Sequence, residues 1–308
     1  MRILFVGAGG VGGYFGGCLA ARGGDVMLLA RGRHAAVIRE RGLRVLSGGK
    51  ILDSRPAVLE PGEPPTVADA LVVAVKHRDL DQALRDAAPS LRPGGAVLSL
   101  LNGIGHEPDF RRLVPHGHLL LGMAFVGASI EEPGVIRHTS EGRMAFGEPD
   151  GPPGELAGAL ERALAIGGFP VRAVADVSAA LWRKVMWNAA FNSLNTLVGG
   201  TCRDLMEVEG MVGELRAVME EVRAVARAEG VDLPADWLEK SLAADVNFTP
   251  YVTSMRLDRE RGHTLELEAI LRRPIAIARQ RCVPMPRLEL LEAALRATER
   301  AGAPPDQD

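Results

Sequence analysis

The sequence predicts two successive domains, an α/β domain with a parallel sheet over residues 1–175 and an all-α domain over residues 176–308. In the first part, short apolar runs alternate with helical patterns, which is typical of parallel strands joined by crossover helices. From about residue 176 onward only helical spacing recurs. The 308 residues are enough for two domains of roughly 100–200 residues each.

The elements of the first domain follow from the period of the apolar residues. The first strand is followed by a glycine turn and by a helix that ends near residue 22, and a second helix is expected at 79–91. The expected strands are 2–6, 25–30, 70–75, 96–100, 119–129, 134–137 and 144–147. We expect the last three strands to close one edge of the sheet.

The second domain is expected to consist of helices at 178–198, 211–229, 236–246, 264–281 and 286–301. The helix 211–229 carries one apolar stripe, which indicates a buried face. Pro274 should kink or end its helix, because proline lacks an N–H group and its ring clashes with the preceding turn. Several apolar stripes in one domain are also compatible with a homodimer.

Composition excludes several classes of protein. A formal net charge of -3 is not the basic field that nucleic-acid binding requires. Three scattered cysteines favour neither a disulfide framework nor a metal site, and they fit a reduced, cytoplasmic protein. The chain has no run of 18 apolar residues, so we expect no membrane span.

The turn after the first strand has the pattern G-x-G-x-x-G, formed by Gly7, Gly9 and Gly12. A glycine pattern between a strand and a helix is typical of dinucleotide binding in Rossmann-type domains, where the pyrophosphate lies at the helix N-terminus. Gly10 and Val11 belong to the same expected cofactor site. The alternative is a merely flexible glycine-rich turn.

The second strand is followed by Arg31 and Arg33, whereas NAD-binding chains usually carry a carboxylate at this place. A guanidinium suits a ribose 2′-phosphate, since its planar fork matches phosphate oxygens. We therefore expect NADP(H) as the cofactor, held by Arg31. The alternative is that both arginines are solvated loop charges.

Lys184, Asn188 and Asn192 follow one another at intervals of four residues, so they share one stripe of an otherwise apolar helix. Polar groups in such surroundings need polar partners or a wet cleft. Spacing alone favours a functional site and a structural network between helices equally. Lysine is rare in this arginine-rich chain, and unlike arginine it can give up a proton.

Several segments together resemble the ketopantoate reductases (2-dehydropantoate 2-reductases) over residues 1–300. The segments are Gly7–Gly12 with Arg31, Val75-Lys76, Leu101-Asn102-Gly103, Leu181-Trp182-Arg183-Lys184 with Asn188 and Asn192, Ser254-Met255 with Asp258, and Gly262–Glu266. The resemblance implies a Rossmann-type domain followed by a helical domain like that of 6-phosphogluconate dehydrogenases. It implies NADPH-dependent reduction of 2-dehydropantoate to pantoate, in the pantothenate pathway.

The resemblance also implies a role for each matching residue. Lys184 would be the general acid, Asn102 would lie beside nicotinamide and substrate, and Glu266 would contact the substrate hydroxyl or position Lys184. The other roles are cofactor binding by Lys76, carboxylate binding by Ser254, and orientation of substrate and lysine by Asn188 and Asn192.

Two segments depart from the family pattern, the stretch Pro250-Tyr251-Val252-Thr253 before Ser254 and the stretch after Glu266, and both are expected near the substrate pocket. After Glu266 the family usually has an Asn-Gly pair, whereas this chain reads Leu267-Glu268-Ala269-Ile270-Leu271-Arg272. This leaves another small branched 2-oxo acid as an alternative substrate, and Glu268 as an alternative to Glu266. A non-enzymatic NADP(H)-sensing regulator is a further alternative, although it gives Lys184 no role.

Overall fold

A computed structural model describes residues 1–246 and 251–302, and these residues form two units. One unit consists of Met1–Leu101 and His106–Val177, and the other consists of Asn102–Gly105 and the chain from Ser178 onward. The four-residue segment Asn102–Gly105 thus groups with the helical unit, although in sequence it follows a strand of the sheet. Residues 247–250 and 303–308 of the predicted second domain lie outside the described residues.

In its described residues the first unit contains one ten-stranded sheet with the order β4-β3-β9-β8-β7-β6-β1-β2-β5, and β10 pairs with β9. The strands β8, β7, β6, β1, β2 and β5 are parallel to one another, as expected for crossover connections. The strands are β1 Ile3–Val6, β2 Val26–Leu29, β3 Leu43–Ser47, β4 Lys50–Ser54, β5 Ala57–Leu59, β6 Ala68–Val73, β7 Leu91–Ser99, β8 His118–Glu132, β9 Val135–Gly147 and β10 Val171–Ala173.

The strands expected at 134–137 and 144–147 are one continuous strand, β9, which pairs antiparallel with β8. The intervening residues 138–143 are mostly polar, so they show no apolar run, but backbone pairing with β8 continues through them. These strands also do not close the sheet edge, because the hairpin β3–β4 pairs with β9 and extends the sheet beyond it.

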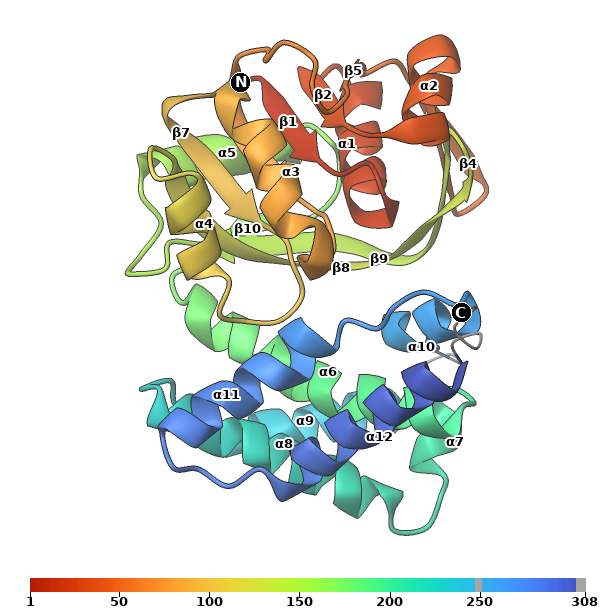
Figure 1. Ribbon diagram of the computed structural model, residues 1–308, viewed down its shortest axis with the longest axis vertical. Coiled ribbons are helices and arrows are strands. Elements are labelled where there is room, and N and C mark those ends of the chain that lie inside the picture. Colours follow the sequence, from red (N-terminus) through yellow and green to blue (C-terminus); the bar gives the residue numbers. More distant parts are fainter. Residues whose placement is uncertain (247–250, 303–308) are drawn as a thin grey trace, which may run out of the picture. The chain divides into compact units, whose positions relative to one another are not determined.

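The sheet is buried on both faces. Ile3 and Phe5 of β1 join one apolar core, whereas Leu4 and Val6 join the other, as the alternation of side chains along a strand requires. Helices α1, α2 and α5 contribute to the first core, and α3 and α4 to the second (Figure 1). Their bounds are α1 Gly10–Ala21, α2 Gly32–Arg41, η1 His77–Asp79, α3 Leu80–Ala87, η2 Ala88–Ser90, α4 Glu107–Leu113 and α5 Glu155–Ala165.

The second unit is helical in its described residues. Its elements are α6 Val177–Val198, α7 Cys202–Met206, α8 Met211–Ala228, α9 Ala235–Val246, α10 Ser254–Glu260, η3 Glu268–Arg272, α11 Arg273–Gln280 and α12 Pro286–Gly302. Helix α8 packs against α7, α9, α11 and α12. Its buried stripe runs from Leu215 to Val225, which confirms the apolar face expected from the sequence.

The helix expected at 264–281 does not begin at Thr264. Residues 264–266 lie outside the helix, a π-helical turn (η3) follows Leu267, and α11 begins only at Arg273. Pro274 lies in the first turn of α11, directly after η3, and Arg272 and Arg273 keep helical backbone angles, so the helix does not end at the proline. The change from π-helical to α-helical hydrogen bonding comes just before this residue, which has no N–H to donate to the preceding turn.

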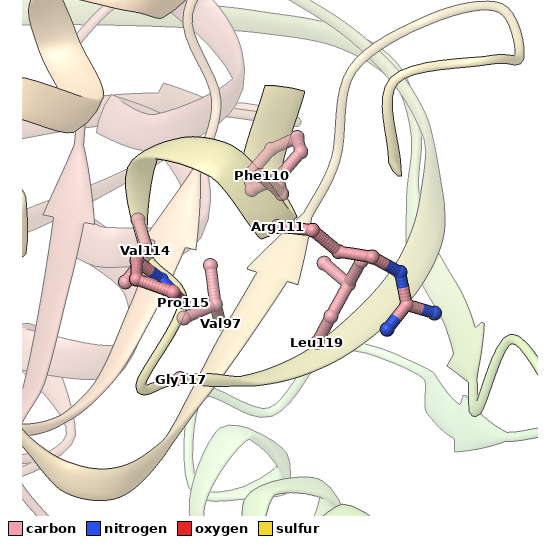
Figure 2. Close-up of a pocket in the computed structure, with 7 residues that line it drawn as sticks. All are labelled: Val97, Phe110, Arg111, Val114, Pro115, Gly117 and Leu119. Carbon is pink, nitrogen blue, oxygen red and sulfur yellow. The ribbon is translucent and has the colours of Figure 1, made fainter. Parts of the chain in front are cut away.

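A pocket of about 190 Å³ lies beside α4 and the amino end of β8 (Figure 2). It is lined by Val97, Phe110, Arg111, Val114, Pro115, Gly117 and Leu119. The glycine turn follows the carboxyl end of β1, which is the edge where parallel α/β sheets bind ligands. The small pocket therefore does not belong to the expected cofactor site. Within residues 1–246 and 251–302, no helix is long and apolar enough to cross a membrane.

Candidate active site

The glycine turn between β1 and α1 depends on backbone geometry that other residues cannot adopt. Gly7 has φ +98°, in the region that favours glycine. A Cβ added at Gly12 would lie 1.9 Å from the Gly7 carbonyl oxygen, so the turn and the helix can approach each other only with glycine at position 12. These two glycines are explained by the packing of the chain itself.

Gly9 is different, because a Cβ added there would meet no heavy atom of the described residues within 4 Å. Packing within the chain therefore does not require glycine at position 9, but a bare backbone suits close approach by a phosphate. Gly10, by contrast, lies against β8, and a Cβ added to it would lie 2.1 Å from the Ala128 carbonyl oxygen. Gly10 and Val11 open α1, whose first N–H groups can receive an anion. The turn fits a dinucleotide pyrophosphate.

The His34 side chain links the glycine turn to the turn between β8 and β9. Its Nδ1 accepts a hydrogen bond from the Gly134 N–H at 3.0 Å, so its Nε2 donates to the Ala8 carbonyl oxygen at 2.9 Å. The ring is therefore neutral, with its proton on Nε2. Burial lowers the pKa of His34 below its ordinary value of 6.5, although the hydrogen bond to Ala8 opposes this effect.

Arg31 follows β2 at the same edge of the sheet, and its guanidinium donates to Oδ1 of Asp79 at 2.9 Å. The Arg31 side chain is 73% exposed and that of Asp79 is 29% exposed. Lys76 lies just after β6 and is half-buried. Within the first unit, the residues expected to bind the cofactor thus come from the carboxyl ends of β1, β2 and β6, which are neighbours in the sheet.

In the second unit, three of the predicted residues form a continuous polar chain. The Lys184 ammonium donates to Oδ1 of Asn102 at 3.0 Å, and Nδ2 of Asn102 donates to Oε2 of Glu266 at 3.1 Å. Lys184 and Glu266 are both half-buried. Asn102 is thus held on one side by a cation and on the other by a carboxylate, which leaves its amide a single orientation.

The segment that carries Asn102 can take this position because Gly103 follows it. Gly103 has φ +88°, and a Cβ there would lie 2.0 Å from the carbonyl oxygen of Ala269 in η3. The backbone of Gly103 therefore packs directly against the backbone of Ala269. Gly103 is one residue after Asn102, and Ala269 is three residues after Glu266. A side chain at position 103 would push Asn102 away from Glu266.

The remaining predicted residues of this unit differ in exposure. Asn188 and Asn192 lie on α6 in the stripe of Lys184 and are 7% and 2% exposed. Ser254 is exposed in the first turn of α10. Glu268 is exposed and lies within salt-bridge distance of Arg272 and Arg273, so Glu266 is the carboxylate that contacts Asn102.

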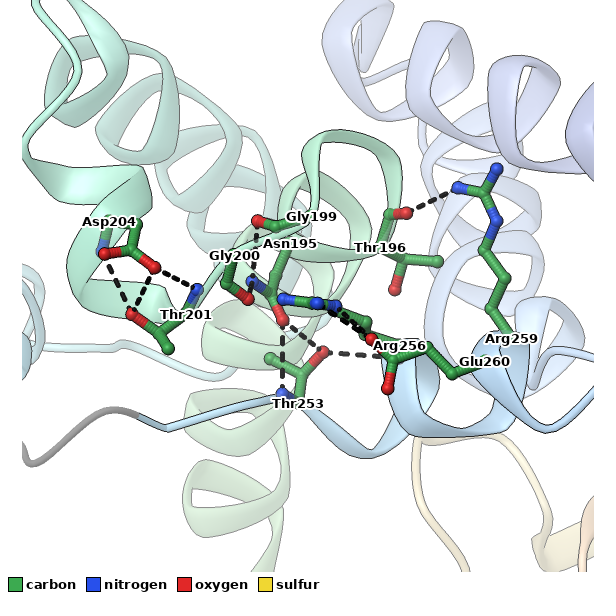
Figure 3. A network of polar contacts seen from close by, with 10 residues as sticks. All are labelled: Asn195, Thr196, Gly199, Gly200, Thr201, Asp204, Thr253, Arg256, Arg259 and Glu260. Carbon is green, nitrogen blue, oxygen red and sulfur yellow. Dashed lines mark hydrogen bonds and ion pairs between the residues drawn. The ribbon is translucent and has the colours of Figure 1, made fainter.

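A second polar network holds the start of α10 (Figure 3). The buried amide of Asn195 accepts hydrogen bonds from the Thr253 N–H and hydroxyl, at 3.2 and 3.1 Å. It donates to the carbonyl oxygen of Gly200 at 3.1 Å, just after α6. Thr253 in turn caps α10 through the Arg256 N–H. This network sets the position of Ser254 relative to α6.

Comparison with protein families decides the relationship of the chain. The model of the ketopantoate reductase PanE/ApbA family matches residues 3–151, and the model of its C-terminal domain matches residues 176–299. The chain belongs to the ketopantoate reductase family. It is therefore an oxidoreductase of a family that depends on nicotinamide dinucleotides, and its fold is the two-part fold expected from the sequence.

Individual relatives agree with this assignment. A 2-dehydropantoate 2-reductase of Halobacterium salinarum is 32% identical over 98% of this chain and 100% of its own length. The crystal structure of 2-dehydropantoate 2-reductase from Methylococcus capsulatus has a TM-score of 0.89 at 32% identity, covering 99% of both chains. A ternary structure of D-mandelate dehydrogenase with NADH and anilino(oxo)acetate has the same TM-score at 24% identity, over 98% of this chain and 99% of its own, and shares the fold.

Three residues of this family member were not found by sequence reasoning. Asn195 continues the stripe of Lys184 three residues after Asn192, so helical spacing could have indicated it. Asp79 follows Val75-Lys76 closely, but nothing in the sequence pairs it with Arg31. His34 contacts Ala8 and Gly134 through tertiary structure alone.

His34 makes stability depend on pH. Its folded-state pKa is lowered, so in the range just below 6.5 the unfolded chain binds more protons than the folded chain. Stability should therefore fall as the pH falls through this range, and His34→Gln should remove that part of the dependence. Thermal unfolding of both proteins over a pH series measures it. Parallel curves would contradict the role of His34.

Proposed function

We propose that this protein reduces 2-dehydropantoate to pantoate with NADPH, in the pantothenate pathway of the cytoplasm. The observation that carries the proposal is the chain of contacts from Lys184 through Asn102 to Glu266. It joins an ammonium that can give a proton to a carbonyl oxygen, an oriented amide, and a carboxylate that can accept a hydrogen bond from a substrate hydroxyl. Relatives named 2-dehydropantoate 2-reductase support the same substrate.

The proposed chemistry divides between cofactor and protein. When bound, NADPH supplies the hydride that adds to the carbonyl carbon of the substrate. Lys184 gives a proton to the carbonyl oxygen, so the product is a hydroxyl group and the lysine is left neutral. The contact with Asn102 holds the ammonium in one place, which reduces the reorganisation that proton transfer would otherwise need.

The other residues of the helical unit bind the substrate in this proposal. Ser254 donates its hydroxyl to the substrate carboxylate, and Glu266 accepts a hydrogen bond from the substrate hydroxyl. Asn188 and Asn192 orient substrate and lysine from the same face of α6. A buried amide can do this because it offers both a donor and an acceptor without charge.

The first unit binds the cofactor. Gly7, Gly9, Gly10, Val11 and Gly12 hold the pyrophosphate at the start of α1. Arg31 binds the 2′-phosphate, Lys76 lies beside the cofactor, and Asn102 lies beside the nicotinamide. The exposure of the Arg31 guanidinium supports its role, since an incoming phosphate can reach it.

A panel of 2-oxo acids, assayed by oxidation of NADPH and of NADH, tests the proposal. We expect the highest kcat/KM with 2-dehydropantoate and NADPH. The departure from the family pattern at residues 267–272 makes another branched 2-oxo acid the second candidate, and a higher kcat/KM for such an acid would favour it. Cofactor binding without turnover of any 2-oxo acid would favour a sensor.

Lys184→Ala should lower kcat by at least roughly 10²–10³, because it removes the group that stabilises the developing alkoxide. Affinity for NADPH should stay nearly normal. Lys240→Ala is a matched control, since Lys240 is exposed and paired with Asp236. Steady-state kinetics and cofactor titration measure both effects, and a Lys184→Ala enzyme with most of its turnover would refute the assignment.

Arg31→Ala should raise the KM for NADPH far more than the KM for NADH. A charge-assisted hydrogen bond contributes about 1.5–3 kcal/mol, and only NADPH carries the phosphate that would receive it. Kinetics with both cofactors measure the difference. Equal effects on the two KM values would show that Arg31 does not bind the 2′-phosphate.

A further inference from the structure

The guanidinium expected to bind the 2′-phosphate already has an anionic partner. Arg31 donates to Oδ1 of Asp79 at 2.9 Å, and Arg78 lies 3.5 Å from Oδ2 of the same carboxylate. Asp79 precedes α3 but, among the described residues, makes no capping hydrogen bond to that helix. The carboxylate is thus committed to Arg31 instead of to its own helix.

We propose that Asp79 is a cofactor-specificity residue, which lowers the preference for NADPH over NADH by competing with the 2′-phosphate for Arg31. The inference rests on the proposed function only in that a nicotinamide dinucleotide binds with its adenosine ribose beside Arg31. It adds a residue that opposes the effect of Arg31 at the same site.

NADPH and NADH would interact differently with the ion pair of Arg31 and Asp79. A 2′-phosphate must displace the Asp79 carboxylate from Arg31 or share the guanidinium with it, which brings like charges close together. A ribose 2′-hydroxyl can instead donate a hydrogen bond to the carboxylate while Arg31 stays paired. Asp79 therefore disfavours binding of NADPH and favours binding of NADH. The acidic residue that usually binds the ribose of NAD follows the second strand, whereas Asp79 lies in the connection between β6 and α3.

The test is the ratio of the dissociation constants for NADPH and NADH, titrated directly by their fluorescence. Asp79→Asn keeps the size of the side chain and removes its charge. We expect it to tighten NADPH binding by about tenfold, since Arg31 is released and a like charge is removed, while NADH binding weakens or stays the same. The shift should shrink at high salt, because the pair is partly exposed.

Two further variants give the matched comparison. Asp79→Glu keeps the charge and should stay closer to the wild-type ratio than Asp79→Asn. Asp81→Asn removes a carboxylate two residues away that pairs with Arg85 and Arg112 instead, and it should leave the ratio unchanged. Melting temperatures should stay close to wild type, because exposed ion pairs contribute little to stability.

An unchanged ratio in Asp79→Asn would overturn the inference, as would an equal shift in Asp81→Asn or binding of neither cofactor. The proposed function fails on a different measurement. A protein that reduces no 2-oxo acid would refute the reductase activity, whereas the ratio of the two dissociation constants would still decide the role of Asp79.

Discussion

The candidate catalytic chain depends on one backbone contact, that of Gly103 with the carbonyl group of Ala269. Only glycine can combine φ +88° with so close an approach. This contact holds Asn102 where its amide can join Lys184 to Glu266. These three side chains come from distant parts of the sequence, and the contact between Asn102 and Glu266 depends on two pieces of backbone packing without a side chain between them.

Close backbone packing also explains most of the glycines in the turn between β1 and α1. Gly7, Gly10 and Gly12 are required because backbone or side-chain atoms of the chain fill the space where a Cβ would lie. Gly9, by contrast, faces open space among the described residues, which is the expected property of a residue that a ligand approaches. The glycine motif by itself does not distinguish the glycines that the packing of the turn requires from the one that it does not require.

Charged side chains are organised differently in the two units. Arg31 and Asp79 are partly exposed, so their interaction is weak in water and can be exchanged for contacts with a cofactor. Lys184, Asn102 and Glu266 are half-buried. Polar groups in such surroundings are costly to leave unpaired, so they are held in fixed contacts. An exchangeable pair suits discrimination between cofactors, whereas a fixed chain suits proton transfer.

Local sequence determined the α/β and helical parts, the glycine turn, the apolar face of α8 and the stripe of Lys184, because each depends on the period of neighbouring residues. Only the tertiary structure decided the features that depend on contacts between residues far apart in the sequence. The polar stretch 138–143 became strand because β8 pairs with it, and residues 264–266 stayed outside a helix. The pairing of Arg31 with Asp79, and of Asn195 with Thr253, joins residues 48 and 58 positions apart. Hydrogen bonds between residues so far apart produce no periodic pattern in the sequence from which they could be predicted.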